Sequence, residues 1–221
     1  MGKKFFSADR LLAPGGQWIE NHVIITDDRG KIEEIIPMEK CPSAAIQQVE
    51  GAIIPGFVNA HCHLELSHMQ GMIPTGTGLV PFIKTVVSQR AARAERIQAA
   101  VVQAEQRMRE AGIVAVGDIS NVTDSFAVKQ KSPIQFYTFI EVFDFMQSAL
   151  TDDTFQKAQG ILAQLPLKSG DGATLVPHAP YSVSPTLFAR LAESADKTAR
   201  FSIHNQELDD EDRMFQEGQS R

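Results

Sequence analysis

The pattern of apolar and polar positions changes near residue 52. Before that point, the β-type runs Trp18–Asp27 and Lys31–Pro37 flank the turn-forming segment Asp27–Gly30, which predicts a small β unit. After it, apolar runs of strand length alternate with longer stretches of helical periodicity, as in repeated βα units. We therefore expect a small β domain over residues 1–52 and a (β/α) domain over residues 53–221.

The second part contains five candidate strands, most of them almost continuously apolar, as strands covered on both faces must be. They are Ile53–His63, Ile113–Ile119, Ile134–Val142, Thr174–His178 and Phe201–His204. Helical patterns lie between or after them, at Val80–Glu110 (as one helix or two), Asp153–Leu165, Pro185–Ala195 and Asp209–Glu217. Gly112 is placed to end the first helix and Ser184 to cap the third. The pattern predicts a parallel sheet with about five βα units.

Composition and charge exclude several classes of partner. The net charge of −6 comes from 27 acidic and 21 basic residues without long runs, which argues against a nucleic-acid backbone as a partner. The first residues lack an apolar stretch long enough for a signal peptide or a membrane span, so we expect no membrane association and a cytoplasmic protein. Only Cys41 and Cys62 are present, which favours reduced thiols over a disulfide framework.

The first candidate strand ends in two histidines. Residues two apart on a strand share a face, so His61 and His63 point into one space while Cys62 points toward the helical layer. Two hydrogen-bonded core histidines would be the structural alternative, but buried neutral imidazoles need partners and a metal ion supplies them most simply. We therefore interpret the pair as metal ligands and Cys62 as a small apolar residue.

Other candidate site residues follow strands. Glu65 continues the face of the histidine pair and could bind substrate, or be an exposed loop carboxylate. His178 ends the fourth candidate strand, the end where (β/α) barrels place their sites, which favours a substrate-contacting or acid-base role. Asp118 and Glu141 also end strands. Either could line the pocket, and each is equally well explained as a hydrogen-bonding support for neighbouring loops, so we do not include them among the catalytic residues.

The fifth candidate strand supplies two more groups. His204 can be a third neutral nitrogen ligand, and Glu207, three residues later, can reach a water activated by the metal and move its proton. The structural alternative for Glu207 is a carboxylate at a helix start, favoured by the helix dipole. We interpret the next acidic residues, Asp209, Asp210 and Glu211, as such a solvated helix start.

These motifs resemble those of the amidohydrolase superfamily, in its branch of mononuclear deaminases and chlorohydrolase-like enzymes. The similarity rests on Pro55–Glu65, on His178–Ser182, and on His204 with Glu207, in that order along the chain. Within this branch the sequence looks closest to deaminases of aminodeoxyfutalosine or S-adenosylhomocysteine.

The resemblance implies a (β/α)₈ barrel of TIM type, with about five of its βα units in this chain, preceded by a small β-sandwich segment. It also implies one ion, zinc or possibly Fe²⁺, held by His61, His63, His204 and an aspartate after an eighth strand, with Glu207 as the proton shuttle. The branch that uses a carboxylated lysine on the fourth strand is disfavoured, because Thr174–His178 contains no lysine.

The family pattern continues for three more βα units, whereas this sequence stops at Arg221. We therefore expect a C-terminally truncated form of low activity, unless a second chain completes the barrel, as in a homo-oligomer. The favoured function is hydrolytic deamination of an amino-substituted purine nucleoside-like small molecule. The alternatives are a chlorohydrolase or cyclic amidine hydrolase of a triazine-like heterocycle, and a non-catalytic metal-binding remnant or interaction module.

Overall fold

The computed structural model describes residues 2–42 and 45–218. The chain divides into two compact units, Met1–Gly56 and Phe57–Arg221, and the predicted boundary between residues 52 and 53 lies close to this division. No helix in the described part of the chain is long and apolar enough to cross a membrane.

The N-terminal unit is one five-stranded sheet in the described residues. Its strands are β1 (Lys4–Leu12), β2 (Trp18–Ile19), β3 (His22–Thr26), β4 (Ile32–Pro37) and β5 (Ile46–Ile53), with β5 parallel to β1 and the other pairs antiparallel. The turn between β3 and β4 forms as predicted, because Asp27 Oδ1 accepts hydrogen bonds from the backbone N–H groups of Arg29 and Lys31. The sequence pattern had not indicated β1, although Ala8 and Leu11 on it are buried.

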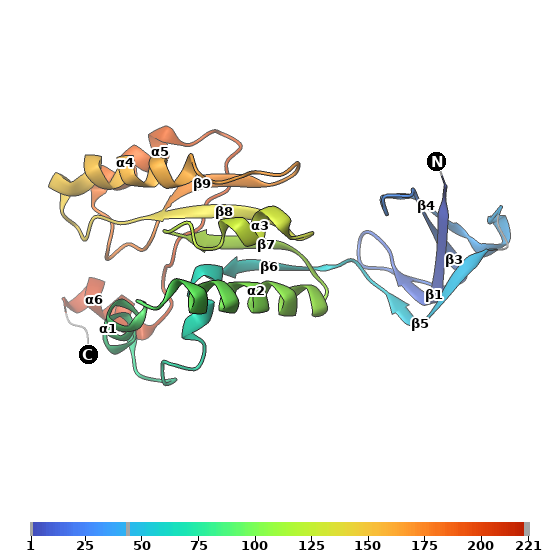
Figure 1. Ribbon diagram of the computed structural model, residues 1–221, viewed down its shortest axis with the longest axis horizontal. Coiled ribbons are helices and arrows are strands. Elements are labelled where there is room, and N and C mark those ends of the chain that lie inside the picture. The colour runs from blue at the N-terminus through green and yellow to red at the C-terminus, as the bar shows by residue number, and fades with distance from the viewer. Residues whose placement is uncertain (1, 43–44, 219–221) are drawn as a thin grey trace. The chain divides into compact units, whose positions relative to one another are not determined.

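The second unit contains the predicted parallel sheet. Its strands are β6 (Phe57–Cys62), β7 (Ile113–Ser120), β8 (Gln135–Val142) and β9 (Gly172–Pro177), hydrogen-bonded in sequence order (Figure 1). All three pairings are parallel. The carboxyl ends of the four strands therefore lie along one edge of the sheet.

The fifth candidate strand is not a regular strand. Residues 201–204 are extended without strand pairing, and the His204 N–H donates to the His178 carbonyl at 2.8 Å. One backbone hydrogen bond does not make a ladder, so the prediction of a strand at Phe201–His204 was wrong, and the described part of this unit has four regular strands. The segment still runs beside the end of β9, which brings His204 to the edge where the strands end.

Helices follow the strands as the periodicity predicted. They are α1 (Leu79–Gln89), α2 (Ala94–Glu110), α3 (Phe126–Lys131), α4 (Thr151–Leu162), α5 (Pro185–Ser194) and α6 (Asp209–Glu217), with 3₁₀ turns η1 (Met38–Lys40), η2 (Leu64–Met69) and η3 (Ser148–Leu150). The long helical pattern is two helices, and Gly112, with φ of +77°, follows the end of α2. The Ser184 side chain caps α5 by accepting the Leu187 N–H. The short α3 was not predicted.

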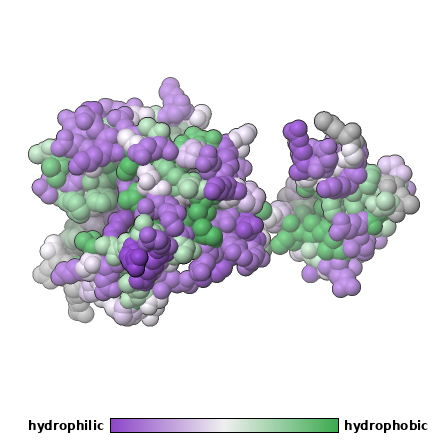
Figure 2. All heavy atoms as spheres, in the orientation of Figure 1, coloured by the Kyte–Doolittle hydropathy of each residue, from purple (hydrophilic) through white to green (hydrophobic). Residues whose placement is uncertain are grey.

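Two apolar clusters hold the helices on the sheet. One, with Val101, Val116, Ile134 and Phe136, joins α2 to β7 and β8. The other joins α4 and α5 to β8 and β9 and includes Ile140, Phe155 and Leu187. Outside these clusters, hydrophilic residues cover much of the visible surface of this unit (Figure 2).

Asp144, just after β8, connects this strand to two helices. Its carboxylate accepts hydrogen bonds from the Ser184 N–H (2.8 Å), the Ser184 hydroxyl (2.5 Å) and the Thr151 hydroxyl (3.0 Å). Burial alone raises the pKa of Asp144, but these hydrogen bonds outweigh it and hold the pKa below its usual value. The carboxylate thus fastens the starts of α4 and α5 to the end of β8.

We expect Asp144→Asn to lower the free energy of unfolding by about 1.5–3 kcal/mol at pH 7, because hydrogen bonds to a charged group are lost. The pKa of Asp144 is lower in the folded protein than in the unfolded chain. Its contribution to stability is therefore complete above the ordinary Asp pKa of about 3.9 and is lost as the pH falls through the lower folded-state pKa. In urea unfolding, the difference between parent and variant should therefore persist at pH 5 and shrink as the pH falls below about 4. The exposed Asp153→Asn is the control, and a difference that grows on acidification would contradict this role.

Candidate metal centre

Three histidines meet at the carboxyl edge of the sheet. His61 and His63 lie at the end of β6 with ring centroids 5.3 Å apart, and the His204 ring lies 4.7 Å from His61 and 5.2 Å from His63. One nitrogen from each ring lies within 4.8 Å of the others. The structure thus brings together all three residues that the sequence predicted as metal ligands.

The donor set fits a tetrahedral zinc ion. The Nε2 atoms of His63 and His204 are 3.2 Å apart. Two nitrogens bound tetrahedrally to one zinc at about 2.0–2.1 Å lie roughly 3.3 Å apart, so this pair already has the required separation. The three imidazoles could therefore hold one divalent ion with little movement.

The protonation of these rings differs. Burial lowers the pKa of His61, and it lowers that of His63 to about 4, which favours the neutral imidazole that binds metal. The hydrogen bond to Glu141 raises the pKa of His204 to about 9, against the effect of burial. A metal ion at this site would therefore take the place of a proton on His204.

Glu207 lies beside His204. Its Oε1 is 2.9 Å from His204 Nδ1, and about half of its side chain is exposed. The Glu207 N–H donates to Glu211 Oε2 at 3.1 Å. Glu207, the predicted proton shuttle, therefore lies next to the histidine cluster. It contacts Nδ1 of His204, whereas Nε2 of the same ring faces His63.

The acidic start of α6 differs from the prediction of a solvated helix start. Glu211 is 2% exposed, so this interpretation was wrong for that residue, whereas Asp209 is exposed. Glu211 Oε2 accepts the N–H of Glu207, four residues earlier, a local contact that the charge pattern did not indicate.

Glu141 belongs to the site more closely than the sequence indicated. Its Oε1 lies 3.3 Å from His204 Nε2, and together with His178 and His204 it forms a second group able to hold a metal ion. It also accepts a hydrogen bond from Asn121 Nδ2. Its position at the end of β8 was the available signal, because every strand of this sheet delivers its last residues to the same edge.

His178 faces the same space. Its Nδ1 lies 2.6 Å from the Ser182 hydroxyl, which fixes the ring, and its ring centroid is 5.2 Å from that of His204. Burial lowers the pKa of His178, so the ring is neutral near pH 7. It remains a candidate for contact with substrate.

Glu65 is neither exposed nor in a loose loop. Its carboxylate is 2% exposed and accepts hydrogen bonds from the Asn121 and Val122 N–H groups and from Arg90 Nη2. Burial raises its pKa to about 7 despite these hydrogen bonds. Any contact of Glu65 with substrate would have to compete with Arg90.

Cys62 points away from the histidines, as predicted. It packs against the apolar cluster between α2 and the sheet. Burial, with a contribution from the Asp118 charge, raises the pKa of its thiol to about 12. The thiol is therefore not among the site's available metal ligands.

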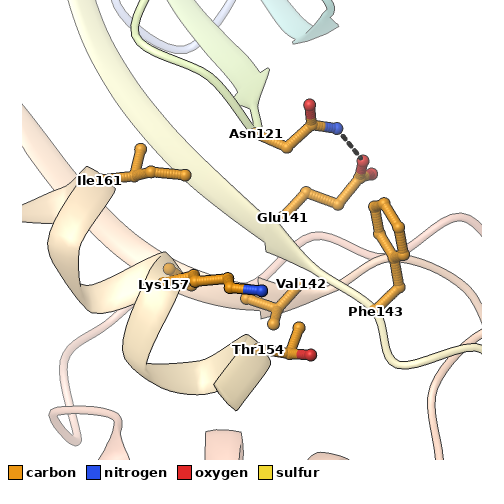
Figure 3. A pocket seen from close by; sticks show the side chains of 8 residues that line it. Asn121, Glu141, Val142, Phe143, Thr154, Lys157 and Ile161 are labelled. Carbon is orange, nitrogen blue, oxygen red and sulfur yellow. Dashed lines mark hydrogen bonds between the residues drawn. The ribbon is translucent and has the colours of Figure 1, made fainter. Parts of the chain in front are cut away.

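A cavity of about 230 Å³ lies next to the site, between the end of β8 and α4 (Figure 3). It is lined by Asn121, Glu141, Val142, Phe143, Thr154, Lys157, Ala158 and Ile161. Glu141 alone among these also belongs to the histidine cluster. The cavity is thus a neighbour of the metal centre and not the centre itself.

The sequence of this chain matches a known protein family. The model of the amidohydrolase family matches residues 52–220. The chain is 27% identical over 192 residues to an adenosine deaminase of Helicobacter pylori, covering 84% of this chain and 46% of that protein.

Solved structures share the fold. Aminofutalosine deaminase from Helicobacter pylori, in complex with methylthio-coformycin, superposes with a TM-score of 0.82 at 23% identity, over 99% of this chain and 54% of that one. Atrazine chlorohydrolase from Arthrobacter aurescens, complexed with zinc, gives a TM-score of 0.73 at 18% identity, over 98% and 56%. The chain spans about half the length of these relatives.

We expect Cys62 to resist alkylation in the folded protein. With a pKa of about 12, only about one thiol in ten thousand is ionised at pH 8, and the thiolate is the reactive form. Mass spectrometry after iodoacetamide treatment should show slow labelling of Cys62 in buffer and fast labelling in urea. Equal rates in both conditions would show that the thiol is accessible and contradict its orientation.

Proposed function

Because the chain belongs to the amidohydrolase family, we propose that His61, His63 and His204 bind one zinc ion for the hydrolytic deamination of a small heterocycle. The observation that carries the proposal is the convergence of these three side chains, from distant parts of the sequence, within 4.8 Å. Fe²⁺ would suit the same nitrogen donors. An ion bound there acts as a Lewis acid that makes water a nucleophile at neutral pH.

Glu207 moves the proton in this proposal. Water adds to the ring carbon that carries the amino group, Glu207 accepts a proton from the water, and the same proton passes to the leaving nitrogen, which departs as ammonia. The half-exposed carboxylate is free to turn from His204 toward a substrate. The adjacent Glu141 stays buried, and its Oε1 faces His204 Nε2, the nitrogen that would hold the ion.

The substrate we propose is an amino-substituted purine nucleoside-like compound. The sequence similarity to an adenosine deaminase supports this class over triazines, since the chlorohydrolase shares only the fold. His178 and Glu65 are the proposed substrate-binding residues, both at the carboxyl edge of the sheet. We further propose a cytoplasmic location and a homo-oligomer.

We expect His61→Ala to lower bound zinc from about one ion per chain to well below that, because one of three imidazole ligands is lost. Zinc is measured by elemental analysis after dialysis against a weak chelator. His22→Ala, in the N-terminal unit, is the matched control and should keep its zinc. Unchanged zinc in His61→Ala would remove the basis of the metal site.

We expect Glu207→Gln to slow ammonia release from adenosine-type compounds by about 10²–10⁴-fold, because the amide cannot carry the proton. The measurement is a single-turnover assay with excess zinc-loaded chain, which detects weak activity, and a triazine panel runs in parallel. Zinc content should stay at the parent level. An unchanged rate would contradict the role of Glu207, and release from triazines alone would favour the chlorohydrolase alternative.

A further inference from the structure

A buried ion pair lies behind the metal centre, on the opposite face of the sheet. Asp118 on β7 and Lys129 on α3 are 0% and 1% exposed and form a salt bridge. Lys129 Nζ also donates to the hydroxyls of Ser120 and Thr138, each at 3.1 Å. Every donor and acceptor of the pair is thus engaged within the protein, as buried charges require.

The same carboxylate reaches the strand that carries the histidine pair. Asp118 lies opposite Cys62 in the β6–β7 register, and its Oδ1 accepts the Leu64 N–H at 2.8 Å. On the other side of that peptide group, the His63 carbonyl accepts the Leu66 N–H at 3.0 Å. The peptide that joins His63 to Leu64 is therefore held at both its oxygen and its nitrogen.

This anchoring matters because the His63 ring has little else to orient it. Within the described residues, its only hydrogen-bond partner is His204 Nε2. The outer nitrogen of a metal-binding histidine is normally fixed by a hydrogen bond to a second group. Here the direction of the ring depends on the backbone from which it projects.

Resting on the metal site of the proposed function, we propose that Asp118, held by Lys129, is a positioning residue that presets His63 for metal binding through the Leu64 N–H. Asp118 contributes no ligand, since it lies on the helical side of the sheet beside Cys62. Lys129 neutralises the buried carboxylate and fixes its rotamer. If Asp118 acts in this way, zinc affinity depends on a hydrogen-bond acceptor at position 118 and not on the negative charge of Asp118.

Two double variants separate these contributions. Asp118→Asn/Lys129→Met keeps an acceptor for Leu64 without charge, and Asp118→Leu/Lys129→Met has similar volume but no acceptor. Zinc affinity is measured by competition with a chromophoric chelator. We expect the Asn variant to bind within about threefold of the parent and the Leu variant at least about tenfold more weakly.

Leu191→Ala, in the apolar cluster under α5, controls for lost stability. It should lower the midpoint of thermal unfolding and leave zinc affinity unchanged. A folded Leu double variant that binds zinc as tightly as the Asn double variant would overturn the positioning role. A parent chain that binds no zinc would instead overturn the proposed function.

Hydrogen exchange of the Leu64 amide tests the positioning role of Asp118 without any substitution. It therefore also tests the proposal if the Leu double variant does not fold. In the metal-free parent we expect this amide to exchange at least about tenfold more slowly than its intrinsic rate, because its hydrogen bond exists before metal binds. Exchange at the intrinsic rate, with protection only after zinc is added, would show that the metal and not Asp118 orders this peptide.

Discussion

The parallel hydrogen-bond ladder from β6 to β9 is the constraint on which the site depends. In a parallel sheet all strands run the same way, so their last residues collect at one edge. The ends are close but staggered. Cys62 lies opposite Asp118, two residues before the end of β7, Ser120 lies opposite Ile140, two residues before the end of β8, and Val142 lies opposite Pro177 at the end of β9. The histidines after β6 and β9 and Glu141 on β8 therefore meet without any help from local sequence.

Side chains along β6 point alternately to the two faces of the sheet, so the histidines and the apolar residues lie on opposite faces. His61 and His63 face the shared space, whereas Cys62 and the following Leu64 face the helices. A buried ion pair, Asp118 with Lys129, is placed on the helical face, where removing one partner costs about 3–5 kcal/mol. The hydrogen bonds of this pair to Leu64, Ser120 and Thr138 connect the end of β6 to β7 and β8, and a fixed end of β6 is what a preformed pair of ligands requires.

Sequence periodicity was enough to predict the parallel sheet, the long helices and the three histidines that the structure brings together, because each of these depends on local pattern or on strand ends. It missed β1, whose pairing with β5 joins distant segments, and the short α3, whose buried Lys129 pairs with Asp118 on β7. It also predicted a strand at Phe201–His204, a segment that does not pair with the sheet as a regular strand. Glu141 was underestimated because its partners, Asn121 and His204, lie far away in the sequence.

Three imidazoles within one small space would repel one another if all were protonated, and the charges around them prevent this. His61 and His63 stay neutral through burial, so His204 alone carries a proton. Glu141 and Glu207 flank that ring on its two nitrogens and balance its charge. A divalent ion that replaces the proton would therefore meet two carboxylates already arranged around a positive centre.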